Sequence, residues 1–135
     1  MANYLDITAA IEIKLQTLST LPANVCYENT EIESSNGGLT LRTYLIPAVS
    51  YYPTLGDSPA HEKGAYQITI EGDENVGRGQ AYTLAEALRT HFKRGDILTY
   101  NNVNVRIEKV QISPAFISDS KYKVPVRVHY VCYSN

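Results

Sequence analysis

The chain has 135 residues, enough for one domain to bury a hydrophobic core without disulfides or a metal ion. Twelve Lys and Arg residues against 14 Asp and Glu residues give a formal net charge of −2, which excludes a general attraction to nucleic acid or anionic lipid. No apolar run approaches the roughly 18 residues of a membrane span, and the N-terminus lacks the charged and apolar regions of a signal peptide. We therefore expect residues 1–135 to form one cytosolic domain without membrane contact.

The N-terminal part of the chain predicts a helix followed by two strands. A helix is expected over residues 6–20, with Asp6 as its cap. Its apolar stripe is Ile7, Ile11, Leu15 and Leu18. A short strand is predicted at 25–29, and turn residues at 33–38 precede an alternating strand at 39–48.

Residues 47–63 are predicted to form a long loop between strands, because they carry three Pro and one Gly and show no periodicity. Tyr51, Tyr52 and Pro53 in this loop are candidate contacts with a neighbouring subunit or other partner, since Tyr offers a large contact area with few rotatable bonds. A surface loop without a partner suits the polar residues of the segment equally well.

A half-buried strand is predicted at 64–72, where apolar and polar residues alternate. The apolar set is Tyr66, Ile68 and Ile70, and the polar set is Gln67, Thr69 and Glu71. Around the end of this strand, the acidic residues Glu71, Asp73 and Glu74 lack the alternating oxygen ligands of a calcium loop and are interpreted as a solvated turn.

Gly77 and Gly79 form a Gly-x-Gly before a helical pattern, as many phosphate-binding loops do. The third glycine of a dinucleotide fingerprint is replaced by Tyr82, and the Lys of a P-loop is absent. Thr83 and Glu86 have the spacing of a capping box, which would satisfy the helix's own N–H groups. We therefore predict no nucleotide site.

The helix that follows is amphipathic and ends with basic residues and Gly95, which suits a left-handed closing residue. Its apolar stripe is Leu84, Ala85, Leu88 and Phe92. A hairpin is predicted over 96–113, with a tight turn at Asn101–Asn102. The apolar set of its second strand changes phase near Glu108–Lys109, which predicts a β-bulge.

The last strand, 121–133, contains Pro125, which cannot donate to a ladder, so this strand is expected to be at an edge or irregular there. Its outward face carries a basic stripe: Lys121, Lys123, Arg127 and His129. This stripe is a candidate nucleic-acid contact. Lys and Arg side chains are also what edge strands commonly carry to prevent unwanted pairing with other strands. No aromatic residue between Lys123 and Val131 on this face could stack on a base.

No catalytic residue, cofactor or metal site is predicted. Cys26 and Cys132 are interpreted as small buried hydrophobic residues. The three histidines, His61 in a loop, His91 on a helix and His129 on a strand, have no metal-ligand spacing. The fold class is α+β: a single antiparallel or mixed sheet, two helices packed on one face, and a long inter-strand loop.

The segments GRGQAYTLAEALRTHFKRGD, DITAAIEIKLQTL and KYKVPVRVHYVCY together resemble the tail terminator proteins of long-tailed bacteriophages. In such chains a Gly-containing turn leads into a helix that ends in Phe-basic-basic-Gly, which here is Phe92 to Gly95. The resemblance covers most of the chain in order of elements. The loop at 47–63 departs from it by being polar and rich in Tyr.

The resemblance implies a virion structural protein of the tail or neck, assembled in the host cytoplasm. It would form a ring, commonly a hexamer, that caps the tail tube, ends tube polymerisation and meets the head–tail connector. DNA would pass through the ring without specific recognition. Two alternatives remain open at this point: a nucleic-acid-binding module that uses the basic stripe as an edge strand, and a small enzyme of a class that the sequence does not reveal.

Overall fold

The computed structural model describes residues 4–20, 22, 24–27, 39–51, 61–73, 79–118 and 120–133. It contains the helices α1 (Tyr4–Gln16) and α2 (Gly79–His91). The strands are β1 (Asn24–Cys26), β2 (Thr40–Tyr51), β3 (His61–Asp73), β4 (Ile97–Tyr100), β5 (Val103–Ile112), β6 (Phe116–Ser118) and β7 (Lys121–Tyr133). Neither helix in this described part of the chain is long and apolar enough to cross a membrane.

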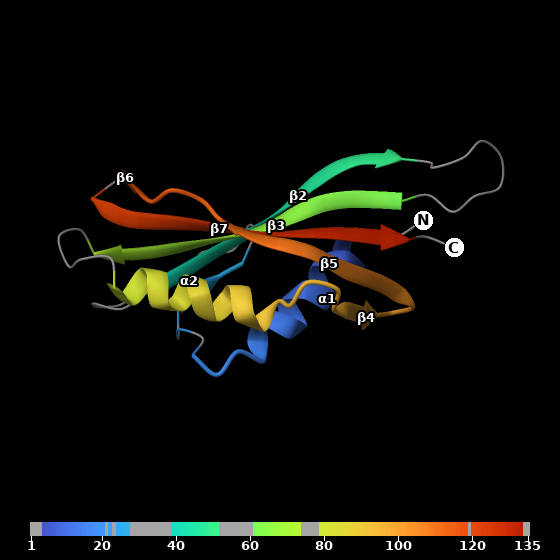
Figure 1. Ribbon diagram of the computed structural model, residues 1–135, viewed down its shortest axis with the longest axis horizontal. Helices are drawn as coiled ribbons and strands as arrows, with labels where there is room; N and C mark the ends of the chain where they lie inside the picture. The colour runs from blue at the N-terminus through green and yellow to red at the C-terminus, as the bar shows by residue number, and fades with distance from the viewer. Residues whose placement is uncertain are drawn as a thin grey trace.

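The strands form one mixed sheet in the order β1-β2-β3-β7-β5-β4, with β6 beside the first residues of β7. All pairs are antiparallel except β1 with β2. Both helices lie on the same side of the sheet (Figure 1). The α+β prediction with two helices on one face is therefore confirmed. We call the face that the helices leave uncovered the outer face.

The core lies between the helices and the sheet. From β3 it takes the alternating set Tyr66, Ile68 and Ile70, and from β7 the set Val124, Val126, Val128, Tyr130 and Cys132, all at most 1% exposed. The helices contribute Ile7, Ile11 and Leu15 from α1 and Ala81, Leu84, Ala85 and Leu88 from α2, with Phe92 just beyond. The predicted stripes thus face the core, as amphipathic periodicity requires.

The helix boundaries differ from the prediction. α1 spans Tyr4–Gln16, so Asp6 lies inside its first turn, and its carboxylate accepts a hydrogen bond from Asn101 Nδ2 at 3.4 Å instead of capping the helix. α2 begins at Gly79, because Ala81 extends the buried stripe by one turn. The capping-box interpretation of Thr83 and Glu86 is wrong, since both residues lie inside the helix and Glu86 pairs with Arg89.

The turn and bulge predictions in the β4–β5 hairpin are confirmed. Asn101 and Asn102 both have positive φ, 50° and 66°, as a type I′ turn requires. The β5–β7 register shifts between Ile107 and Lys109, which places a bulge at Glu108. Gly95 has φ +90°, and its N–H donates to the carbonyl oxygen of Ile107 at 2.8 Å, so this glycine turns the chain from α2 into the hairpin.

The predicted loop at 47–63 is wrong at both ends, because β2 and β3 continue into it. Pro47 pairs with Gly64, the register then shifts, and Tyr51 pairs with His61. The register shift follows Pro47, which has no N–H to donate to the ladder. Strand β1 accompanies β2 only as far as Arg42. His61 therefore begins a strand and does not lie in a loop. Tyr52 and Pro53 fall outside the described residues.

Strand β7 is a central strand, so the edge interpretation of Pro125 is wrong and the irregular one is confirmed. On one side Pro125 faces Thr69 of β3. On the other side the neighbouring strand is interrupted between Ile112 and Phe116, and the Pro125 carbonyl accepts a hydrogen bond from the Ser113 N–H at 2.9 Å. The interruption lies where a donor from β7 would have been needed.

Candidate interaction surfaces

The outer face of the sheet is polar, and its centre is covered by long side chains. Register places the side chains in rows that cross the strands, such as Thr40–Glu71–Lys123 and Tyr44–Gln67–Arg127–Gln111. Gln67, Thr69 and Glu71 of β3 are only 7–8% exposed. The expected half-buried strand is therefore buried on both faces, because cationic side chains from β2 and β7 lie over it.

Glu71 is the centre of an ion cluster on this face. Its Oε1 accepts from Arg42 Nε at 2.9 Å, and its Oε2 lies 3.5 Å from Lys123 Nζ. The hydrogen bond to Glu71 also raises the pKa of the Arg42 guanidinium. The interpretation of Glu71 as part of a solvated turn is wrong, since the carboxylate is nearly buried between cations from two neighbouring strands.

The predicted basic stripe follows the outer face of a central strand and not an edge. Lys123 pairs with Glu71, Arg127 Nε donates to Gln67 Oε1 at 2.9 Å, and His129 Nε2 lies 3.2 Å from Gln111 Oε1. Lys121 begins the strand opposite Ser118. Burial lowers the pKa of His129, and the nearby cations Lys109 and Arg127 lower it further.

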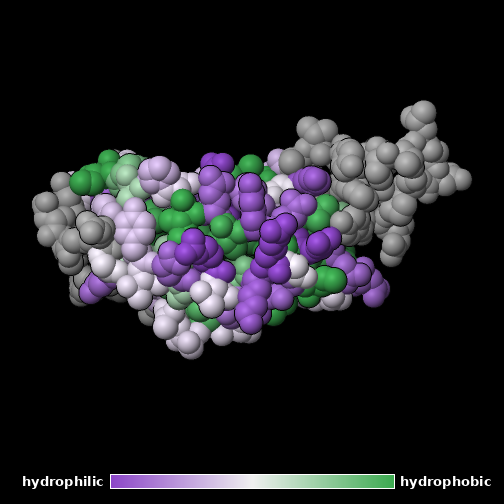
Figure 2. Space-filling view, viewed as in Figure 1, coloured by the Kyte–Doolittle hydropathy of each residue, from purple (hydrophilic) through white to green (hydrophobic). Residues whose placement is uncertain are grey.

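The sequence interpretation missed that β5 adds cations to the same face. Arg106 and Lys109 share the outer face with Val131 and His129, their register partners on β7. A polar depression of about 440 Å³ beside them is lined by Arg94, Arg106, Ile107, Glu108 and Lys109. Figure 2 shows hydrophilic side chains gathered across the middle of the molecule, over β5 and the end of α2. The alternation of charges along 103–112, read together with the predicted bulge, could have indicated this.

The two long edges of the sheet differ in chemistry. Within the described residues, no strand covers β2 from Thr43 to Tyr51 on the side away from β3. At the other edge β4 packs against α1, and large apolar side chains there are exposed: Leu5 by 77%, Ile97 by 64% and Tyr100 by 40%. A further exposed apolar pair, Phe116 and Ile117, lies on β6, which is at the left end of the sheet in Figure 1.

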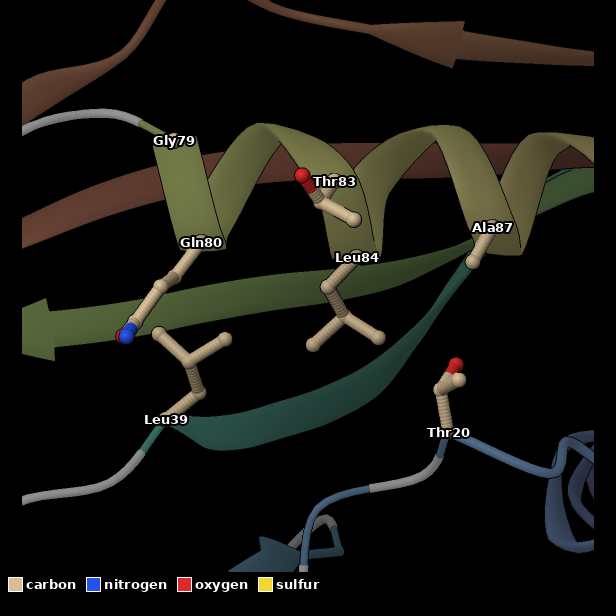
Figure 3. Close-up of a pocket in the computed structure, with 7 residues that line it drawn as sticks. All are labelled: Thr20, Leu39, Gly79, Gln80, Thr83, Leu84 and Ala87. Carbon is tan, nitrogen blue, oxygen red and sulfur yellow. The ribbon is translucent and has the colours of Figure 1, made fainter.

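An apolar groove of about 560 Å³ lies between α2 and the start of β2 (Figure 3). Leu84 and Ala87 line it from the helix, and Leu39 and Thr20 line it from the opposite side. Gly79 and Gln80 lie at its end, where the sequence had raised the question of a phosphate loop. Among the described residues the lining of this groove is mostly apolar.

The candidate contacts of the β2–β3 hairpin are described only in part. Tyr51 is the last residue of β2, opposite His61, and Tyr52 and Pro53 follow it outside the described residues. The cysteines are both buried, as predicted, and form no disulfide with each other, since they lie on strands β1 and β7, which β2 and β3 separate. His91 Nε2 lies 2.6 Å from the Lys14 carbonyl oxygen and 2.9 Å from Thr17 Oγ1, so it ties the end of α2 to the end of α1.

Comparison with known proteins gives one family and one fold. The sequence profile of a family described as phage tail terminator protein matches residues 6–130. A solved structure of a protein without a functional name is 21% identical, with a TM-score of 0.77 over 100% of this chain and 98% of that one. At this identity the likeness concerns the fold alone. No curated protein matches the chain.

Proposed function

Because the chain belongs to the phage tail terminator family, whose members are structural proteins of the tail, we propose that it caps the tail tube as a ring. The ring ends tube polymerisation and joins the tail to the head–tail connector, with DNA passing through it. The observation that carries this proposal is the family match, which extends over residues 6–130 and leaves out only the chain ends. A role in completing the phage tail, as a component of the virion, follows from that match.

The two unlike edges of the sheet support ring closure. A ring needs a surface on each subunit that fits a different surface on the next, repeated until the rotation closes. The edge of β2, beside which no described strand lies beyond Arg42, offers Tyr44, which is 40% exposed. The opposite edge offers β4 with the exposed apolar side chains of Leu5, Ile97 and Tyr100. Edge strands and exposed apolar side chains are common contact elements between subunits.

The β2–β3 hairpin is the second element of the proposal. Its strands run side by side toward the upper right in Figure 1, and their last described pair, Tyr51 and His61, lies level with Tyr133 at the end of β7. We assign Tyr51, Tyr52 and Pro53 at its end to contact with the neighbouring subunit or with the tail tube. Tyr is enriched in protein interfaces because it combines a large apolar face with a polar tip.

The proposal is tested with purified tail tubes and this protein carrying a gold-binding tag. Electron microscopy should show the label at one end of each tube, as a ring, and capped tubes should stop growing when further tube protein is added. Label along the sides of the tubes, or unchanged growth of labelled tubes, would refute a terminator function. Self-association alone does not test it, so the tubes are part of the assay.

The hairpin assignment is tested separately with the double variant Tyr51→Ser/Tyr52→Ser. We expect weaker ring or tube association and an unchanged melting temperature of the isolated subunit. The matched control is Phe116→Ser/Ile117→Ser, which removes two exposed apolar side chains at the opposite end of the sheet. Normal capping by the tyrosine variant would exclude the hairpin contact, and a lowered melting temperature would place these tyrosines in the fold's own core.

A further inference from the structure

The part of the outer face formed by β5 and β7 carries an excess of positive charge on a chain whose formal net charge is −2. Arg106, Lys109 and Arg127 lie on it, and Arg94 reaches the polar depression at its border. Within the described residues none of these four cations forms an ion pair. The nearby carboxylate, Glu108, lies 3.9 Å from Lys63 Nζ. Within the described part of the chain this region, which we call the β5–β7 basic face, therefore keeps an excess of positive charge.

The surroundings of His129 are a second indication of positive charge on this face. His129 lies between Lys109, its register partner on β5, and Arg127, two residues earlier on β7. Burial is the main cause of the lowered pKa of its imidazole, Lys109 and Arg127 lower this pKa further, and Glu108 opposes them in part. An anionic partner bound at this point would reduce the positive potential around His129.

Ring closure through the two sheet edges would leave this face one of two positions. When subunits join edge to edge, one face of every sheet becomes the wall of the channel and the other face becomes the exterior. The helices occupy one face (Figure 1), and the strand register places the cationic side chains on the other. The face of a sheet of several strands is too broad to enter a groove of duplex DNA, unlike a single helix or a two-stranded ribbon, so its Lys and Arg side chains would contact phosphates and not base edges.

We propose that the β5–β7 basic face lines the channel of the ring and contacts the phosphate backbone of duplex DNA. The proposal rests on the proposed function, because it takes the ring and its edge-to-edge closure from it. The contact is independent of sequence, and it is weak and sensitive to salt because a few cations displace counterions from the phosphates. Arg106, Lys109 and Arg127 are the residues expected to make it, with Arg94 at the border.

The test measures binding of the full chain to a 20-base-pair duplex by fluorescence anisotropy at 20 mM and 150 mM salt. The charge-reversal variant is Lys109→Glu/Arg127→Glu. Its matched control, Arg89→Glu/Lys93→Glu, makes the same change in net charge on exposed side chains of α2 and the turn after it. We expect at least a tenfold weaker affinity for the first variant and less than a threefold change for the control. Equal losses in the two variants would show that only net charge matters and would overturn the proposal.

Two further measurements identify the partner. The pKa of His129, followed by NMR, should rise when the duplex binds and should not change with an uncharged polymer. Poly-glutamate of the same charge serves as the second probe, and if it binds as tightly as the duplex and loses the same affinity in the first variant, the face is a site for an acidic protein and the proposal is wrong. Absence of duplex binding at 20 mM salt would also overturn it.

Tube capping by the charge-reversal variant separates this inference from the proposed function. We expect Lys109→Glu/Arg127→Glu to form rings and cap tubes as the unaltered protein does, since neither residue lies on β2 or β4. If it fails to form rings while the unaltered protein succeeds, the face is a subunit contact and the DNA assignment is wrong. If the unaltered protein itself does not cap tubes, the proposed function fails whatever the DNA measurements give.

Discussion

Replacing Gly64 by Ala tests how closely β2, β3 and β7 are packed at the base of the β2–β3 hairpin. A Cβ atom built on Gly64 would lie 2.6 Å from Tyr130 Oη, 2.9 Å from Tyr130 Cζ and 2.7 Å from the Ile46 carbonyl oxygen. Favourable separations between non-bonded heavy atoms are about 3.5–4.0 Å. Tyr130 is 1% exposed, so its ring has no room to withdraw. The added methyl group must therefore displace the backbone of β2 or the ring of Tyr130.

The size of the effect follows from which atoms must move. Inserting a methyl group into a well-packed core typically costs about 1–3 kcal/mol. Here one of the clashing atoms is the backbone oxygen of Ile46, and β2 is held to β3 on both sides of it by the pairs Ile46–Ala65 and Pro47–Gly64. We therefore expect a loss of about 3 kcal/mol in the free energy of unfolding, which is roughly a 10 °C fall in melting temperature for a domain of this size.

Urea unfolding of the isolated subunit measures this loss, with Gly79→Ala as the control. Gly79 begins α2, and a Cβ atom there meets no atom within 4 Å. Ala at this position should therefore change the free energy of unfolding by no more than about 0.5 kcal/mol, and the helical position favours Ala over Gly. Repeating Gly64→Ala in the background of Tyr130→Leu should recover at least about 1 kcal/mol of the loss. A loss below about 1 kcal/mol for Gly64→Ala, or no coupling to Tyr130, would refute this description of the packing.

Three further predictions concern other parts of the fold. Phe92→Ala should lower the free energy of unfolding by about 3–5 kcal/mol in urea titrations, because Phe92 is 1% exposed at the end of the α2 stripe; a loss below about 1 kcal/mol would contradict its place in the core. Glu71→Gln should lower the free energy of unfolding by about 1.5–3 kcal/mol, since two cations lose their shared carboxylate. High salt should reduce this difference in stability between the variant and the unaltered protein. A variant as stable as the unaltered protein would show that the ion cluster contributes nothing to stability. Because the pKa of His129 is lowered in the folded state, the unfolded chain binds protons more readily below about pH 6.5, so stability falls as the pH drops through this range. Unfolding measured from pH 7 to pH 5 should show a smaller decrease for His129→Gln, and equal slopes would exclude this contribution.

Local chemistry was enough to predict the features that depend on a few adjacent residues. Asn101–Asn102 predicts the tight turn because Asn tolerates positive φ, and the phase change at Glu108–Lys109 predicts the bulge because one extra residue reverses which side chains face the core. The apolar stripes of both helices and the alternation in β3 and β7 likewise identify the core face, since burial selects the same period along each element. The class of fold follows from these patterns.

Only the tertiary structure decided which strands are neighbours, and the surfaces depend on that. Pro125 is compatible with an edge strand or with an interruption opposite it, and the break between β5 and β6 selects the second. Pro47 suggests a loop until pairing with β3 carries β2 onward to Tyr51. Glu71 is solvated unless Arg42 and Lys123 come from both sides, and the β5–β7 basic face exists only because a bulged strand lies beside β7. Strand order joins residues that are far apart in the chain, and no local preference encodes the free energy of those contacts.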